Sequence, residues 1–183
     1  MKKVLLVSLI ALLTTLAVYA YETVIIKFPQ DEVWIKAYYK KIKQESILQY
    51  VPKGQSQQEW NRAIIIHAYE DSAYPANIFM ANNLAMMTKT NPTSQYKYLR
   101  LNDNECMAGR CTKDYKGIKS QCEFYRVVRA HNGIISIHYI NKDKDDFMHN
   151  YKLWYDIVRK AKFLNTHWRN ERTLNKSEYF ELW

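Results

Sequence analysis

The sequence has little glycine and little proline, with four residues of each in 183. Their scarcity excludes a collagen-like or linker-rich chain and indicates one folded domain. No P-loop, GxGxxG or GxSxG pattern occurs, so the common signatures of nucleotide binding and of serine hydrolases are missing. The cysteines form no CxxC pair and no HxxxH is present, which disfavours zinc. We therefore expect no metal and no cofactor.

A second long apolar run is also lacking, and the first lies at the N-terminus. Lys2 and Lys3 precede the apolar stretch 4–17, and Val18-Tyr19-Ala20 offers small residues where a signal peptidase reads them. The run is shorter than the roughly 20 apolar residues of a membrane span. Residues 1–20 are therefore predicted to be a cleaved signal peptide, and the protein is expected to be periplasmic or secreted.

The charge of the chain is mainly positive. Removing Lys2 and Lys3 leaves 25 basic and 18 acidic side chains, a net charge of +7. Such a balance favours acidic partners, for example a lipid head-group surface or an acidic protein. Because an exported protein does not meet nucleic acid in its compartment, no nucleic-acid partner is expected.

Three cysteines are an odd number, so in an oxidising compartment two should pair and one should remain free. Cys111 and Cys122 are equidistant from Lys116-Gly117, and a two-residue turn there would place them opposite each other in a hairpin. Cys111–Cys122 is the favoured disulfide, and Cys106–Cys122 is the alternative.

Alternating and aromatic segments predict a mainly antiparallel sheet. The expected strands are 34–43, 46–51, 60–69, 96–101, 123–129 and 134–140, and the cysteine-bearing stretch 103–121 is expected to be irregular. The strand 60–69 is apolar on both faces and should lie inside the sheet. Helices are expected from Pro75 to Thr88, with Ser72 as cap, and from about Asp145. The order β-β-β-α-β-β-β-α indicates an α+β domain with helices on one face, spanning residues 21–168.

Two groups of residues are candidates for a role in binding or structure. Trp34, Lys36, Tyr38 and Lys40 alternate along one strand and could present an aromatic, cationic face to an acidic surface, although Trp34 and Tyr38 could equally pack inward. Pro52 and Gly54 predict a turn, Ser56 can bond a backbone amide, and Trp60 should anchor the following strand. His67 and His138 lie in expected strands and are interpreted as structural. The tail 169–183 ends in four apolar residues out of five, which either dock onto the domain or serve a secretion machinery.

Two stretches carry a family resemblance. Both resemble motifs of small exported proteins in Legionella-like gammaproteobacteria. The first stretch consists of Glu45-Ser46, Tyr50 to Ser56 and Trp60. The second consists of Glu123, Arg126, Gly133, Tyr139, Lys142 and Trp154. The resemblance covers residues 45–154 and implies a Mog1/PsbP-type sandwich whose members mostly bind or assemble rather than catalyse. Some members are type II-secreted, so release as a virulence-associated factor is also implied. It implies no catalytic residue, and the cysteine-bearing stretch has no counterpart in it.

The sequence thus predicts an exported, non-enzymatic binding protein with an unknown protein or an anionic lipid surface as partner. The alternative is a hydrolase that acts on envelope or host material.

Overall fold

The structure is a computed structural model that describes residues 21–130, 133–166 and 179–181. The expected signal peptide, residues 1–20, and most of the tail 169–183 lie outside the described residues. The elements are β1 (Tyr21–Ile25), β2 (Trp34–Ile42), β3 (Glu45–Pro52), β4 (Arg62–Glu70), α2 (Ala76–Thr90), β5 (Gln95–Asn102), β6 (Glu105–Thr112), β7 (Gln121–Ala130), β8 (Gly133–Asn141), α3 (Lys144–His149), α4 (Tyr151–Lys160), β9 (Lys162–Thr166) and β10 (Tyr179–Glu181).

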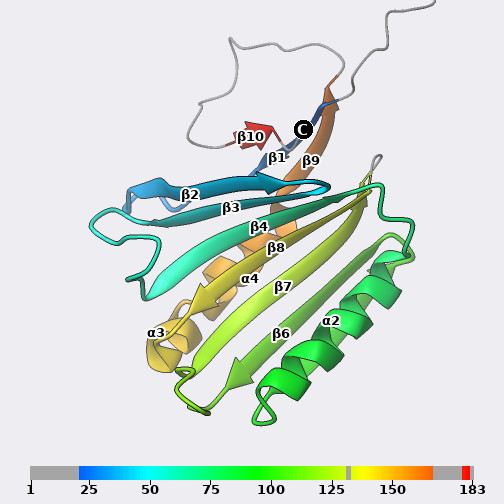
Figure 1. Ribbon diagram of the computed structural model, residues 1–183. Coiled ribbons are helices and arrows are strands. Elements are labelled where there is room, and N and C mark those ends of the chain that lie inside the picture. Colours follow the sequence, from blue (N-terminus) through cyan, green and yellow to red (C-terminus); the bar gives the residue numbers. More distant parts are fainter. Residues whose placement is uncertain (1–20, 131–132, 167–178, 182–183) are drawn as a thin grey trace, which may run out of the picture.

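The strands of the described residues form two antiparallel sheets (Figure 1). The larger sheet has the order β2-β3-β4-β8-β7-β6-β5, and the smaller has the order β10-β1-β9. The predicted α+β class with a mainly antiparallel sheet is thereby confirmed. The prediction that the third expected strand lies inside the sheet is also confirmed, because β4 pairs with β3 on one side and with β8 on the other.

Helices cover both faces of the large sheet, with α2 on one face and α3 and α4 on the other. Ala76, Met80 and Leu84 of α2 pack against Tyr125 and its neighbours on one face. Trp154 and Val158 of α4 pack with Phe124 and Tyr139 on the other face. Successive strand residues point to opposite faces, so adjacent Phe124 and Tyr125 serve the two layers. The expectation of helices on a single face is therefore wrong.

The last expected helix is divided in two at Asn150. The carboxylate of Asp143 accepts hydrogen bonds from the backbone N–H groups of Asp145 and Asp146 at 2.9 and 3.0 Å and so caps α3. After the break, α4 ends where the Arg126 guanidinium donates to the carbonyls of Val158 and Ala161, both at 2.8 Å. A buried cation is thus placed at the negative end of a helix.

The stretch 103–121 is the main difference in secondary structure, because it contains β6. Its pattern is weak, with Gly109 and small residues where apolar ones would mark a strand. β6 is nevertheless a strand because it pairs with both β5 and β7, and this pairing outweighs its weak local pattern.

The small sheet places part of the C-terminal tail on the domain, because β10 pairs with Thr23–Ile25 of β1. Within the described ranges, no helix combines the length and the apolar composition that crossing a bilayer would require.

Candidate functional site

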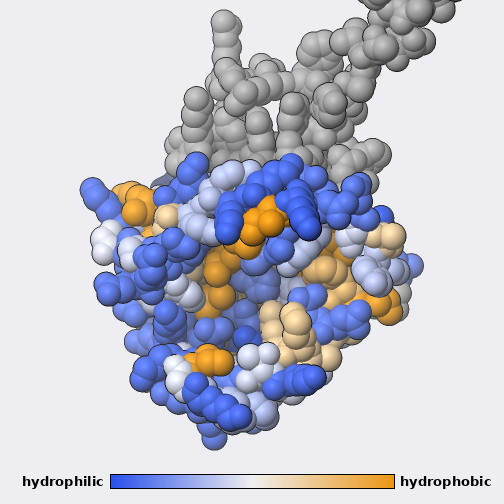
Figure 2. Space-filling view, in the orientation of Figure 1, coloured by the Kyte–Doolittle hydropathy of each residue, from blue (hydrophilic) through white to orange (hydrophobic). Residues whose placement is uncertain are grey.

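The face of the large sheet that carries α2 is hollowed over its middle strands, as Figure 2 shows, and we call it the concave face. α2 lies over β6 and β7 and reaches β4 through Phe79, whose ring centroid is 5.0 Å from that of Tyr69. Polar side chains gather on this face. They come from three strands and comprise Glu45, Gln49, His67, Tyr69, Ser136 and His138. Glu123 of the neighbouring strand β7 completes the cluster beside His138.

The strand register sets how these side chains lie relative to one another. Gln49 is opposite Ile65 on β4, and Ile65 is opposite His138 on β8. Since neighbouring strands are about 4.8 Å apart, Gln49 and His138 flank Ile65 at a separation of about 10 Å. In the next row His67 is opposite Ser136. The row of Ile65 therefore has an apolar centre with a hydrogen-bonding side chain on either side.

Gln49 carries an unpartnered hydrogen-bond donor. Its side chain is buried, with 6% of the residue exposed, and its Nε2 has no hydrogen-bond partner among the described residues. An unpaired buried amide costs about 1–3 kcal/mol. A group that accepts a hydrogen bond from Gln49 would recover that free energy.

Glu45 and His67 form the more exposed part of the cluster. Nδ1 of His67 lies 3.1 Å from Oε1 of Glu45. Burial and the nearby His138 lower the pKa of His67, against the opposing effect of Glu45. His67 is thus held in its neutral form, in which one ring nitrogen donates and the other accepts.

Glu123 is the centre of the deeper part of the cluster. Its Oε1 accepts a hydrogen bond from Nε of Arg110 at 2.5 Å, and its Oε2 lies 3.2 Å from Nδ1 of His138. Burial alone would raise the pKa of Glu123, but the hydrogen bonds and charges of His138 and Arg110 hold it below its ordinary value. Arg110 also donates to Ser94 Oγ at 3.2 Å. The carboxylate is therefore ionised although it is buried.

Ser136 adds a third side chain to the contact between Glu123 and His138. Its Oγ lies 3.4 Å from Nε2 of His138. Serine, histidine and glutamate therefore follow one another in the order of a nucleophile, its base and the orienting carboxylate. Ser136 is 1% exposed, and the ring of Tyr125 stacks on His138 with centroids 4.0 Å apart. The hydroxyl is consequently shielded from solvent.

The two tyrosines beside the cluster stay protonated. Burial, together with the nearby Glu45, raises the pKa of Tyr69. Burial likewise raises the pKa of Tyr125, with smaller effects of Tyr69 and Glu123. Their hydroxyls are therefore hydrogen-bond donors at neutral pH, and the hydroxyl of Tyr69 is engaged with Glu45.

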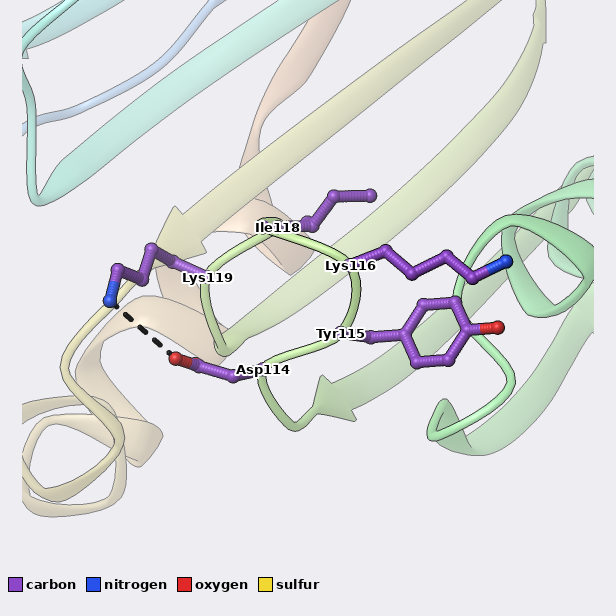
Figure 3. A pocket seen from close by; sticks show the side chains of 6 residues that line it. Asp114, Tyr115, Lys116, Ile118 and Lys119 are labelled. Atoms are coloured by element: carbon purple, nitrogen blue, oxygen red, sulfur yellow. Dashed lines mark ion pairs between the residues drawn. The ribbon is translucent and has the colours of Figure 1, made fainter.

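The favoured disulfide is present. Cys111 and Cys122 are directly paired residues of β6 and β7 and are bonded, whereas Cys106 is a buried free thiol. Lys116 and Gly117 both have positive φ, as a two-residue hairpin turn requires. In Figure 3, Asp114 and Lys119 form an ion pair across the base of the turn at 3.6 Å, while Tyr115 and Lys116 point together to the other side. The pocket beside them has only about 190 Å³ and lies below the size of ordinary ligand sites.

The expected aromatic and cationic face on β2 does not have the expected geometry. A bulge between Lys36 and Tyr38 shifts the register, so that Lys36 is opposite Tyr50 and Tyr38 is opposite Gln49. Adjacent residues of β3 face opposite ways, and therefore Trp34 and Lys36 lie on one face and Tyr38 and Lys40 on the other. Trp34 is buried in the core, where its ring contacts that of Trp154.

The expected turn motif has its predicted local structure. Gly54 has φ of 93°, and Gln55 N–H donates to the carbonyl of Pro52 at 3.1 Å. The Ser56 hydroxyl accepts a hydrogen bond from the backbone N–H of Glu59 at 3.0 Å. Trp60 precedes β4 instead of beginning it, and Lys142 Nζ lies over its ring at 3.7 Å. The motif shapes the entry into β4 and lies outside the polar cluster.

The polar cluster itself was not identified from sequence. The sequence predicts structural roles for His67 and His138, and no pattern in it marks Gln49 or Arg110. Glu123 belongs to the second resemblance motif, which implies no site there. A signal was present in β7 and β8, where charged and polar residues interrupt otherwise apolar strands. Within residues 21–130, 133–166 and 179–181, no group of three or more potential ligands is arranged to hold a metal ion.

A groove of about 730 Å³ runs on the other face of the sheet, between β5 and helices α3 and α4. Phe124, Phe147, Tyr151 and Tyr155 line it. Aromatic rings make up much of its lining. The unpartnered buried donor on this side of the sheet, Nε1 of Trp154, is not among the lining residues.

No family model matches the chain, and a search of curated proteins also found no match.

Proposed function

We propose that the protein is an exported, non-enzymatic binding protein that holds a small polar ligand on the concave face. The unpartnered Nε2 of Gln49 supports this proposal, since it lies in a row that also contains Ile65 and His138. The leader-like N-terminus and the disulfide support export. The Mog1/PsbP-type sandwich and release by type II secretion belong to the same proposal and rest on the motif resemblance.

The arrangement defines the chemistry of the ligand. An acceptor such as an amide carbonyl or a sugar hydroxyl would pair with Gln49 after its buried side chain turns toward the ligand. An apolar ring or chain would lie over Ile65, and a second polar group would reach the His67–Glu45 pair, which offers both a donor and an acceptor. Small neutral amides and sugars meet these requirements.

The test uses the mature protein labelled with ¹⁵N and a set of small amides and monosaccharides as probes. Binding should shift the side-chain amide signals of Gln49 and the ring signals of His67. Gln49→Leu should remove the binding, and Gln95→Leu on the exposed edge strand β5 should keep it. Probes that bind both variants equally, or that shift none of these signals, would contradict the proposal.

The second candidate is a hydrolase, and one observation favours it: the chain Ser136–His138–Glu123. In that function Ser136 would attack an acyl carbon, Nε2 of His138 would take the hydroxyl proton, and Glu123 would hold the imidazole by its Nδ1–H. The burial of Ser136 opposes it, because the nucleophile must reach a substrate.

An active-site label separates the two candidates. A fluorophosphonate should leave the mass of the native protein unchanged if the protein only binds. A covalent adduct on Ser136, absent from Ser136→Ala, would establish the hydrolase instead. Ser46, which is also buried, provides the matched control variant Ser46→Ala.

A further inference from the structure

A further cavity, separate from the turn pocket and the aromatic groove, lies on the opposite side of the sheet from the concave face. It has about 830 Å³ and is formed by β1, α4, β9 and the residues next to them. Four lysines line it: Lys27, Lys152, Lys160 and Lys162. We call it the lysine pocket. Its size is within the range of sites that hold drug-sized ligands.

The lining combines positive charge with apolar surface. Ile25, Leu153 and Ile157 supply the apolar part, and Asp156 is the single acidic residue among the lining residues. Asp156 is occupied by Lys160, whose Nζ lies 3.0 Å from Oδ2. Three lysines therefore have no acidic partner within the pocket lining. Leu153 is 46% exposed, so apolar area is available between the ammonium groups.

We infer that the lysine pocket binds the acidic head group of a membrane lipid together with the first part of its acyl chain. Ammonium groups attract anionic head groups, and each one near an acidic membrane surface adds about 1 kcal/mol to binding. Neighbouring apolar side chains contact the acyl carbons, while the lysine stems lie along the same surface. The net charge of the chain adds attraction at longer range. The inference is independent of the ligand on the concave face.

Vesicle binding tests the inference, with vesicles of phosphatidylglycerol and of phosphatidylcholine as probes. The mature protein should bind the former, should ignore the latter, and should be released by salt because the attraction is screened. Lys152→Glu/Lys162→Glu should weaken the binding by about tenfold or more. Lys36→Glu/Lys40→Glu changes the net charge equally, at exposed lysines of β2, and should lower the affinity much less.

A second pair of variants tests the apolar part without changing a lysine. Leu153 and Ile78 are the third residues of α4 and α2 and are 46% and 45% exposed. Leu153→Asp should abolish binding, and Ile78→Asp should preserve it. Because both positions are exposed, neither substitution should disturb the fold, and circular dichroism would check this. Absence of binding by the wild type, or equal losses in the paired variants, would overturn the inference.

Discussion

Gly54 and Gly133 both have positive φ, but only one of them is enclosed. A Cβ at Gly54 (φ +93°) would meet nothing within 4 Å, whereas a Cβ at Gly133 (φ +154°) would lie 1.9 Å from the carbonyl oxygen of Tyr69. At Gly54 the cost of a side chain is backbone strain alone. At Gly133 it also includes a collision with the central strand β4.

We therefore expect two very different alanine variants. Gly54→Ala should lower the free energy of unfolding by about 1–2 kcal/mol, the cost of a left-handed residue. Gly133→Ala should lower it by about 4 kcal/mol or more, since the backbone of Tyr69 cannot yield without breaking strand pairing. Urea denaturation measures both, and similar losses would show that Gly133 does not pack as described.

Glu123 and Arg110 form the most buried ion pair among the described residues, with side chains 2% and 9% exposed. Glu123→Gln should destabilise the protein by about 3 kcal/mol, because it leaves a buried guanidinium without its counter-charge. Glu105→Gln is the matched control, since Arg126 keeps two carbonyl partners in its absence. Chemical denaturation of both at pH 7 measures the difference, and a larger loss in the control would contradict this account.

The lowered pKa of His67 predicts how the stability of the protein depends on pH. Its folded pKa is lowered from the ordinary value of 6.5 by burial and by His138, so folding favours the neutral ring. The corresponding stability is present above pH 6.5 and is lost as the pH falls toward the folded pKa. His67→Gln should lose less stability between pH 7.5 and pH 5 than the wild type. The exposed His149 provides the control His149→Gln, which should decline as the wild type does.

At the scale of elements, the hairpin β6–β7 is held both by its turn and by a disulfide bond. The turn at Lys116-Gly117 sets the register, and the register brings Cys111 opposite Cys122. The equal spacing of the cysteines about the turn was visible in the sequence, which is why the disulfide could be predicted while β6 itself could not. By contrast, the bulge in β2 depends on how β3 pairs with it, and no local pattern in β2 marks it.

Thiol titration and stability measurements follow from this hairpin. The native unreduced protein should show no reactive thiol because Cys106 is buried, and about one per chain after denaturation. Cys111→Ser/Cys122→Ser should lose about 2–3 kcal/mol of stability, as a bridge closing a short loop predicts. Three thiols in the unreduced denatured protein would contradict the pairing.

The candidate site shows a similar division between what the sequence reveals and what the fold adds. Alternation placed β4, β7 and β8 correctly and made β4 a central strand. The polar cluster depends on the pairing of β3 with β4, of β4 with β8 and of β8 with β7, so its residues come from four separate segments. Gln49, His67, His138 and Glu123 are neighbours only once the register is fixed, and the register is a property of the whole sheet.

At the scale of the whole molecule, the disulfide bears on where the protein works. A disulfide forms and persists in an oxidising compartment, which is compatible with the proposed export.

The last prediction is that cleavage occurs after Ala20. In a bacterial host, the exported protein should have Tyr21 as its first residue, by N-terminal sequencing or intact mass. Ala20→Arg should block processing, because the peptidase requires a small residue at that position, and should leave a larger precursor in the membrane fraction. Ala17→Arg serves as the control: it alters the apolar stretch three residues upstream and should reduce export as a whole instead of trapping the precursor after translocation. A chain that keeps Met1 and all three thiols in the cytoplasm would contradict export.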